Sequence, residues 1–328
     1  RAGCRHYDHN VLDFEAEARA AKGRNAFQDA TALMFESMAK STRRRVEMEL
    51  FHGQQGLGTV ASISTNTITV TTSEWAPGNW AGSEGAVIQI YNSSLSTSRG
   101  TATIVSVDLD ARTITVDSAP GGVSANDVIY WKGQVTAGGT PAYAGMVGLH
   151  KALSTSSGSL FNISTATYNL WRATSYAAGS AALTFQKIQD ALARAYVRGL
   201  DEDCVLFVNP RAFGNLVTDQ AALVRHKSGE IKNQVMNGSK SIEFYALNGK
   251  VTIEPSPYVK EGYAYGICAD AWKRVGASDV SFNVPGQGDQ VFFVTPTANA
   301  VEARCYVNMA LMPESLAKNF IITGIVNA

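Results

Sequence analysis

The sequence has no long apolar run and no excess of either charge, and these two absences exclude several kinds of protein. No stretch reaches the roughly 18 consecutive apolar residues of a membrane-spanning helix, so we expect no membrane partner. Lysine and arginine number 28, as do aspartate and glutamate, so the formal net charge is zero. Domains that attract nucleic acid over a distance usually carry a positive excess, so we expect only non-specific contact with it.

Cysteines are few and scattered, which excludes a disulfide framework. The chain has four of them, they form no C-x-x-C pair, and the last three lie inside apolar runs. Buried thiols of this kind are typical of a reducing compartment. We therefore predict a cytosolic origin and free thiols at Cys4, Cys204, Cys268 and Cys305.

Residues of the types that bind metals gather only near the N-terminus, at Cys4, His6, Asp8 and His9. Ligands spaced so closely do not all reach one ion, and the rest of the chain offers no second half of a site. We predict a polar arm there, with no metal and no cofactor.

Signatures of catalysis are absent as well. The sequence has neither the G-x-x-x-x-G-K-[ST] loop that binds phosphates nor the G-x-S-x-G nucleophile elbow. His52, His150 and His226 are isolated in sequence, and only their geometry would show a triad with a serine. We predict no catalytic residue.

A long helix is predicted from about Lys22 to Phe51. Phe27, Ala30, Met34 and Met38 recur every three or four residues and form one apolar stripe, and a glycine-rich turn follows the helix. About 28 residues at about 1.5 Å each reach about 40 Å, which is long for a compact domain. We interpret this helix as a long support that crosses a flat molecule.

The composition changes after Gly58, where serine and threonine become frequent and charged residues become rare. Thr67–Val70 and Thr113–Val116 have the same sequence, and each follows a valine-containing strand and a polar turn. Short alternating runs of this kind are typical of antiparallel hairpins. We predict a small antiparallel barrel or sandwich, inserted into a chain that otherwise alternates helix and strand.

A helix, a strand and a second helix are predicted further along the chain. The apolar face of the first helix is followed by Gly199, which closes it, and then by the apolar strand Cys204–Val208. Asn209 caps the second helix, which begins at Pro210. Together these elements predict an α/β layer. The apolar face consists of Phe185, Ile188, Leu192 and Ala195.

The last third of the chain is mostly strand. From Ala303 to Leu311 apolar and polar residues alternate, so one face of this strand is expected in a core. Pro313 ends it, and Phe320–Val326 forms a final apolar strand.

In this order, the elements resemble the major capsid protein of tailed bacteriophages, whose fold encapsulin shells share. The matching parts are a spine helix with its glycine-rich turn, the helix–strand–helix of an axial domain, a strand pair with its return strand, and the closing strands. They are Lys22–Gly58, Leu183–Leu216, Lys240–Val275 and Gln290–Val326, about half of the chain.

The resemblance implies an α+β capsid fold with an inserted β domain. Its parts are an N-terminal arm (1–22), the spine helix of a peripheral domain (23–58), the β-rich insertion (59–134), an axial domain with connecting loops (135–275) and closing strands of the peripheral domain (276–328). The family places an extended hairpin before its spine helix, and about 22 residues are too few for one. Either an upstream piece is missing, or the insertion replaces the hairpin by pairing open strand edges with a neighbouring subunit.

The implied function is structural, not enzymatic. Copies of the chain would form pentamers and hexamers that join into an icosahedral shell around double-stranded DNA. Assembly would take place in the host bacterial cytoplasm, and the protein would remain in the virion. Scaffolding, portal and decoration proteins are implied as further partners.

The charged end of the spine helix supplies our candidate intersubunit contacts. Two of its arginines have a glutamate four residues further on. A solvated helix face is the alternative, but so long a helix in a shell has to touch its neighbours. The candidates are Arg43, Arg44, Arg45, Glu47 and Glu49.

Three other functions stay open. An encapsulin-type cargo shell has the same fold and a different content. A sugar-binding virion or surface module would stack glycans on Trp75, Trp80 and Trp131, although burial is the commoner role of tryptophan. An enzyme would depend on one of the isolated histidines.

Overall fold

The computed structural model describes residues 4–13, 24–138, 141–220, 241–247, 249–283, 286, 290–294 and 300–327. The chain forms two compact units, which we call unit 1 (Arg1–Leu50 with Arg274–Met312) and unit 2 (Phe51–Lys273 with Pro313–Ala328). No helix among the described residues is long and apolar enough to cross a membrane.

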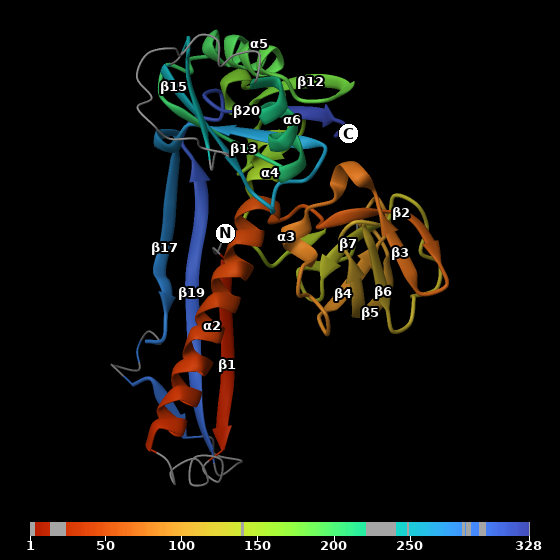
Figure 1. Cartoon of the computed structure of the whole chain (residues 1–328), viewed down its shortest axis with the longest axis vertical. Coiled ribbons are helices and arrows are strands. Elements are labelled where there is room, and N and C mark those ends of the chain that lie inside the picture. The colour runs from red at the N-terminus through yellow and green to blue at the C-terminus, as the bar shows by residue number, and fades with distance from the viewer. Residues whose placement is uncertain are drawn as a thin grey trace. The chain divides into compact units, whose positions relative to one another are not determined.

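Unit 1 combines the long helix with a four-stranded sheet. Helix α2 spans Arg24–His52, close to the predicted bounds, and ends at the glycine-rich turn. The sheet has the order β1-β19-β17, and β18 also pairs with β19 (Figure 1). The strands are Cys4–Asp13 (β1), Trp272–Ser281 (β17), Phe292–Val294 (β18) and Ala300–Pro313 (β19).

The core of unit 1 forms between α2 and β19. Met38, Ala303 and Cys305 are buried together, with Phe35 packed against them. The apolar face predicted for this strand is thereby confirmed. The same holds for the Met34–Met38 part of the predicted helix stripe, whereas the side chains of Phe27 and Ala30 lie outside the described residues.

The N-terminal segment differs from the polar arm predicted over residues 1–22. Strand β1 pairs antiparallel with β19 along its whole length, from Cys4 opposite Met309 to Asp13 opposite Ala300. Polar side chains support this pairing, because the Tyr7 hydroxyl donates to the Glu302 carboxylate over 2.9 Å. The described part of the arm is therefore a strand of the unit 1 sheet.

The β-rich insertion in unit 2 is a closed barrel, one of the two predicted forms. Its strands follow the order β2-β3-β6-β5-β4-β7 (Figure 1). The two identical segments are β3 and β6, and they pair directly, with Ile68 opposite Ile114. The barrel strands are Gly58–Ser64 (β2), Thr67–Val70 (β3), Val87–Tyr91 (β4), Ser98–Asp108 (β5), Thr113–Val116 (β6) and Val128–Trp131 (β7).

Closure of the barrel corrects the prediction of open strand edges. In a closed barrel each strand pairs on both sides, so the described insertion offers no free edge for a neighbouring subunit.

Short elements lie within and after the barrel. The segment between β3 and β4 carries helix η1 (Thr72–Glu74) and helix α3 (Pro77–Trp80). Two-stranded pairs follow the barrel: Val135–Thr136 (β8) with Ala142–Tyr143 (β9), and Ser159–Leu160 (β10) with Ile163–Ser164 (β11).

A six-stranded sheet forms the other half of unit 2, in the order β12-β20-β16-β13-β15-β14. Its strands are Thr174–Ala181 (β12), Cys204–Val208 (β13), Ile242–Ala246 (β14), Gly249–Pro255 (β15), Tyr263–Ile267 (β16) and Phe320–Ile325 (β20). The helices are Leu149–Ser154 (α4), Phe185–Tyr196 (α5), Pro210–Gln220 (α6) and the short turns Asn169–Trp171 (η2) and Ala269–Ala271 (η4).

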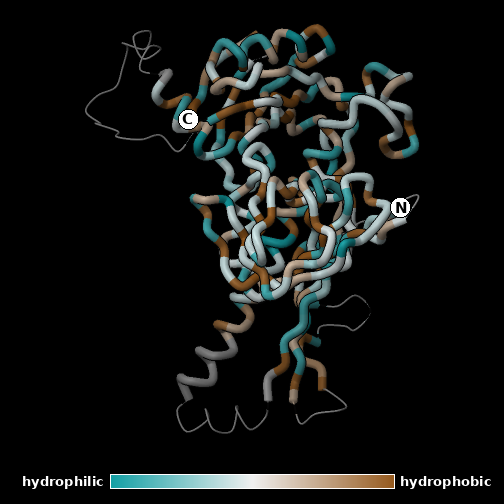
Figure 2. The backbone as a smooth tube through the Cα atoms, turned by 90° about the vertical axis from the view of Figure 1, so that its right-hand side faces the viewer, coloured by the Kyte–Doolittle hydropathy of each residue, from teal (hydrophilic) through white to brown (hydrophobic). Residues whose placement is uncertain are grey.

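The predicted helix–strand–helix layer is confirmed. In α5, Ile188 is fully buried and Leu192 is 1% exposed. The helical turns at the top of Figure 2 alternate between hydrophilic and hydrophobic colours, as an amphipathic helix does. The Asn209 side chain accepts from the Arg211 backbone N–H over 3.0 Å and so caps α6.

The final strand lies elsewhere than predicted. Residues 276–328 were expected to close the peripheral domain, but β20 pairs with β12 and β16 in the sheet of unit 2. The reason is its apolar content on both faces: Phe320, Ile321 and Ile322 are all fully buried, as an inner strand requires.

We predict that truncating Ile188 or Leu192 to alanine lowers the free energy of unfolding by about 2–5 kcal/mol, because each change leaves a cavity in a packed core. Chemical denaturation of each variant measures the loss. Val197→Ala is the matched control, since Val197 is 85% exposed on the same segment. A change within about 0.5 kcal/mol for both core variants, the size usual at surface positions, would contradict this packing.

Candidate functional site

The predicted contact residues lie in the last turns of α2, within unit 1. Arg43 and Glu47 are exposed, whereas Arg44 and Arg45 are half-buried. Glu49 is buried, with only 3% of its side chain exposed. The five residues therefore do not form one exposed surface.

Glu49 is engaged inside the subunit. Its carboxylate lies 2.8 Å from His6 Nε2 on β1 and 3.9 Å from Arg45 Nε on the same helix. A carboxylate that is buried and paired in this way is not available to a neighbour. This removes Glu49 from the candidate contacts, and contact through the other four residues stays a prediction.

A second concentration of charge lies in unit 2, where the barrel meets the six-stranded sheet. The Lys260 side chain is 1% exposed. Its ammonium donates to the Gly56 carbonyl over 2.9 Å and pairs with the Glu74 carboxylate. The Tyr263 hydroxyl donates to the other Glu74 oxygen over 2.8 Å, so both ends of the pair have several partners. We call this group, Lys260, Glu74 and Tyr263, the lysine junction.

Backbone hydrogen bonds explain why these side chains meet. The Glu261 N–H donates to the Trp75 carbonyl and the Gly262 N–H to the Ser73 carbonyl, each over 2.9 Å. The approach is so close at Gly262 that a Cβ atom there would lie 2.7 Å from the Ser73 Cβ. Glycine is therefore required for the turn after β15 to pack against η1.

A neighbouring ion pair spans the same boundary. The Arg112 guanidinium, on the β5–β6 turn of the barrel, donates from Nε and Nη2 to the two oxygens of Glu261 over 3.1 and 2.9 Å. The Glu261 side chain is 3% exposed, and Arg211 on α6 lies 3.7 Å away. A bidentate pair of this kind fixes the orientation of the guanidinium relative to the carboxylate as well as the distance between them. Barrel and sheet are thus joined by two carboxylates, Glu261 buried and Glu74 half-buried, each paired with a cation.

The partners of Glu74 determine the direction in which its pKa is shifted. Burial alone raises the pKa of this carboxyl, but the charge and hydrogen bond of Lys260 and the hydrogen bond of Tyr263 outweigh burial, so its pKa lies below the ordinary value. The carboxylate therefore stays ionised, which the buried ammonium beside it requires.

His52 and His150, isolated in sequence, lie next to each other in the folded chain. Their ring centroids are 6.3 Å apart. His52 Nε2 lies 2.6 Å from the Tyr258 carbonyl oxygen, and His150 Nδ1 lies 2.7 Å from the Tyr265 hydroxyl. Burial lowers the pKa of both imidazoles well below the ordinary value, and the nearby Lys260 charge lowers it further. Both rings are therefore neutral at pH 7.

The histidine pair does not form a catalytic triad with a serine. Neither ring has a hydrogen bond to a serine in the described part of the chain, and the bonds given above engage a carbonyl and a phenol. His226 lies outside the described residues. Sequence reasoning missed this pair, since the two histidines are 98 positions apart (150 − 52) and no motif surrounds either.

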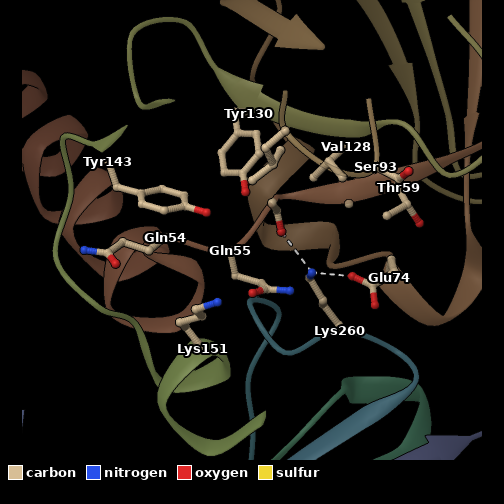
Figure 3. A pocket seen from close by; sticks show the side chains of 13 residues that line it. Gln54, Gln55, Thr59, Glu74, Ser93, Val128, Tyr130, Tyr143, Lys151 and Lys260 are labelled. Atoms are coloured by element: carbon tan, nitrogen blue, oxygen red, sulfur yellow. Dashed lines mark hydrogen bonds and ion pairs between the residues drawn. The ribbon is translucent and has the colours of Figure 1, made fainter. Parts of the chain in front are cut away.

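A cavity of about 260 Å³ opens beside the lysine junction (Figure 3). The figure shows Tyr130 and Tyr143 pointing into it from one side, and Gln55 and Lys260 from the other. Burial raises the pKa of both phenols, so they remain protonated hydrogen-bond donors at neutral pH. The lining is polar, with Lys151 and the Lys260–Glu74 pair among its charged groups.

No metal centre is present among the described residues, where no three His, Cys, Asp or Glu side chains come together. In the N-terminal set, His6 pairs with Glu49, and Asp8 accepts from the Thr42 hydroxyl over 2.6 Å. These contacts are structural.

The tryptophans proposed as a sugar platform are buried. Trp75 and Trp80 are fully buried and stacked, with ring centroids 5.9 Å apart, and Trp131 is 6% exposed. A ring without an open face does not stack on a glycan, so the interpretation of these residues as a sugar platform is wrong.

The chain is similar to shell proteins of known structure. It matches the satellite phage P4 procapsid with its size determination protein over 98% of this chain and 71% of that chain, with 11% identity and a TM-score of 0.41. The cyanophage A-1(L) capsid asymmetric unit matches over 56% of this chain and 61% of that chain, with 14% identity and a TM-score of 0.40. The holo-SrpI encapsulin complex from Synechococcus elongatus PCC 7942 matches over 55% and 56%, with 11% identity and a TM-score of 0.32.

The chain covers less than two thirds of the cyanophage and encapsulin chains. No protein-family model and no curated protein matches the sequence. Likenesses at these TM-scores and identities carry no argument about function, which has to rest on the chain's own residues.

We predict that Glu74→Gln destabilises the protein by about 3–5 kcal/mol, because it leaves the buried Lys260 charge without its counterion. The double variant Glu74→Leu with Lys260→Met is expected to lose less, since it removes both charges. Urea denaturation compares the variants. Glu243→Gln, which breaks the exposed pair of Glu243 with Lys250, is the control and should cost roughly 0–1 kcal/mol. Equal losses in Glu74→Gln and this control would contradict the role of the junction.

We also predict that stability falls as the pH decreases below about 6.5, the ordinary pKa of histidine. The unfolded chain binds protons at His52 and His150 in that range, whereas the folded chain holds both rings neutral, so unfolding gains protons and acid favours it. Urea midpoints between about pH 5 and 7.5 measure the slope. Replacing both histidines with glutamine should flatten it, and an unchanged slope would contradict the assignment.

Proposed function

We propose that this chain is the structural shell subunit, or major capsid protein, of a tailed bacteriophage. In this proposal copies assemble through pentamers and hexamers into an icosahedral head that encloses double-stranded DNA. The protein acts through its surfaces and not through an active site.

The combination of elements in the two units carries the proposal. Unit 1 holds a 29-residue helix along a sheet whose strand β19 has 14 residues. Unit 2 holds a six-stranded sheet with α5 and α6. Elongated elements in one unit and an α/β layer in the other suit a subunit that reaches its neighbours over a broad surface, as the resemblance in sequence implies.

Assembly follows from repeated weak contacts. Identical subunits that meet through two different surfaces form closed rings when the rotation between them closes. Each contact need contribute little, because the others hold the partner at a high effective concentration. We include Arg43, Arg44, Arg45 and Glu47 among these contacts, and non-specific charge contacts with the packaged DNA.

Closure of the barrel limits how the insertion could contact a neighbouring subunit. Without free edges it does not extend a neighbour's sheet, so contact with another subunit would use its side chains. Scaffolding, portal and decoration proteins remain proposed partners in the virion.

We predict that the purified full chain, alone or with a scaffolding protein, forms rings or closed shells. Electron microscopy and analytical sedimentation are the measurements. A compact monomer at all concentrations, with and without scaffold, would contradict the proposal.

The content of the particles separates the two kinds of shell. Particles isolated from a natural source should contain double-stranded DNA if the chain is a phage capsid protein. A co-purifying enzyme in place of DNA would indicate an encapsulin-type shell instead.

A further inference from the structure

Two apolar features of unit 2 remain without a role, and the first is a groove. It has a volume of about 530 Å³ and is lined by Ile163, Tyr168, Leu170, Trp171, Glu314 and Ser315. Tyr168 and Leu170 are 61% and 65% exposed. Pockets of this size hold a drug-sized molecule, so there is room for two side chains of a partner. We call this feature the apolar groove.

A strained turn stands beside the groove. Phe161 and Asn162 form the two-residue turn between β10 and β11, and both have positive φ, 53° and 65°. Asparagine or glycine adopts this conformation readily, whereas a bulky residue such as phenylalanine rarely does. Phe161 is nevertheless 43% exposed, so no core contact of its own explains its presence. Strain of this kind is common where a residue serves a binding contact, which directs attention to the neighbouring groove.

The second feature is the tip of the β14–β15 hairpin. Tyr245 and Leu247 are 82% and 70% exposed there. Lys250 lies opposite Tyr245 in the ladder. We call Tyr245, Leu247 and Lys250 the hairpin tip.

The register of the sheet places groove and tip at the same end but at opposite edges. Thr174 of β12 lies opposite Phe320 of β20, and Phe320 lies opposite Gly266 of β16. Gly266 pairs with Leu206 of β13, and Leu206 pairs with Ile253 of β15. Strands β12, β20, β13 and β15 run in the same direction, so the start of β15, where the hairpin turns, lies at the same end of the sheet as the starts of β12 and β20. The groove residues immediately precede β12 and β20 in the chain.

The distance between the two edges excludes contact within one chain. Strands β12 and β14 are the outermost of six, so five spacings of about 4.8 Å, about 24 Å in all, separate them. The side chains of Tyr245 and Leu247 do not reach across that distance. A hairpin tip that occupies a groove must therefore come from another copy.

The apolar groove and the hairpin tip also carry opposite charges. The groove carries the Glu314 carboxylate, and the hairpin tip carries the Lys250 ammonium. Within one chain Glu314 pairs with Lys273, and Lys250 pairs with Glu243. Both pairs are exposed, and exposed ion pairs contribute little free energy, so they can exchange partners at little cost. Apolar side chains at the centre with opposite charges at the rim are the usual make-up of a protein interface.

We propose that the hairpin tip of one subunit inserts into the apolar groove of the next, head to tail. Since the two features lie at one end of the sheet and at opposite edges, each subunit gives one tip and receives another, and the contact repeats around a ring. This inference rests on the proposed shell function and names the surfaces that would build the ring.

A crosslinking experiment with the full chain tests the contact. Two differently tagged variants, Leu247→Cys and Leu170→Cys, are made in a Cys4→Ser background, in which Cys204, Cys268 and Cys305 remain buried. Oxidation of the mixed assembly should link one copy of each variant, because a disulfide forms only when two Cα atoms come within about 7 Å. Val105→Cys mixed with Leu170→Cys is the matched control, since Val105 is exposed on the barrel, and should give no link.

A charge variant provides the second readout. Leu247→Asp should reduce the yield of rings and shells about tenfold or more, because truncating an apolar anchor commonly has an effect of that size. Its urea midpoint should stay at the wild-type value, since Leu247 is exposed, and Val105→Asp should assemble normally.

The outcomes separate this inference from the proposed function. Normal shells without the 247–170 crosslink, or normal yield from Leu247→Asp, would overturn the contact and leave the shell function standing. A wild-type chain that never assembles would overturn both.

Discussion

A buried ammonium group with one carboxylate counterion constrains the whole of unit 2. Moving a charge from water into a protein interior costs several kcal/mol, so Lys260 is tolerated only where Glu74 and the Gly56 carbonyl reach it. Those partners belong to the barrel side of the unit and Lys260 to the sheet side. The barrel is therefore a fixed part of unit 2 and not a tethered appendage.

Polar contacts at this boundary favour one arrangement over others. An apolar interface tolerates small shifts, whereas the buried and half-buried polar groups here find their partners in only one position: Arg112 with Glu261, and Tyr263 with Glu74. The backbone bonds at Gly262 tie the same turn to η1. We expect such a boundary to contribute more to specificity of packing than to net stability, which would suit a subunit whose outer surfaces have to recur in many copies.

Local patterns predicted the elements that their own residues determine. Helix α5 follows from its 3.6-residue period, and α6 from the Asn209 cap, because both signals lie within a few positions. Strand β1 was missed, since its polar sequence becomes a strand only by pairing with β19, some 300 positions away. The burial of Glu49 depends on His6, 43 positions away (49 − 6), and the placement of β20 depends on β12, 146 positions away (320 − 174). Periodicity shows which face is apolar, but it does not show which element covers that face.

The barrel leaves and rejoins the rest of unit 2 at adjacent points. Gly58 at the start of β2 lies opposite Ile129 near the end of β7, in one antiparallel pair. To the remainder of the chain, the whole barrel is thus equivalent to a short turn, because its two ends are as close as those of a hairpin. Loop-closure entropy grows only slowly with the length enclosed. The turns inside the barrel could therefore lengthen or shorten with little effect on the rest of unit 2, provided that Glu74 still reached Lys260.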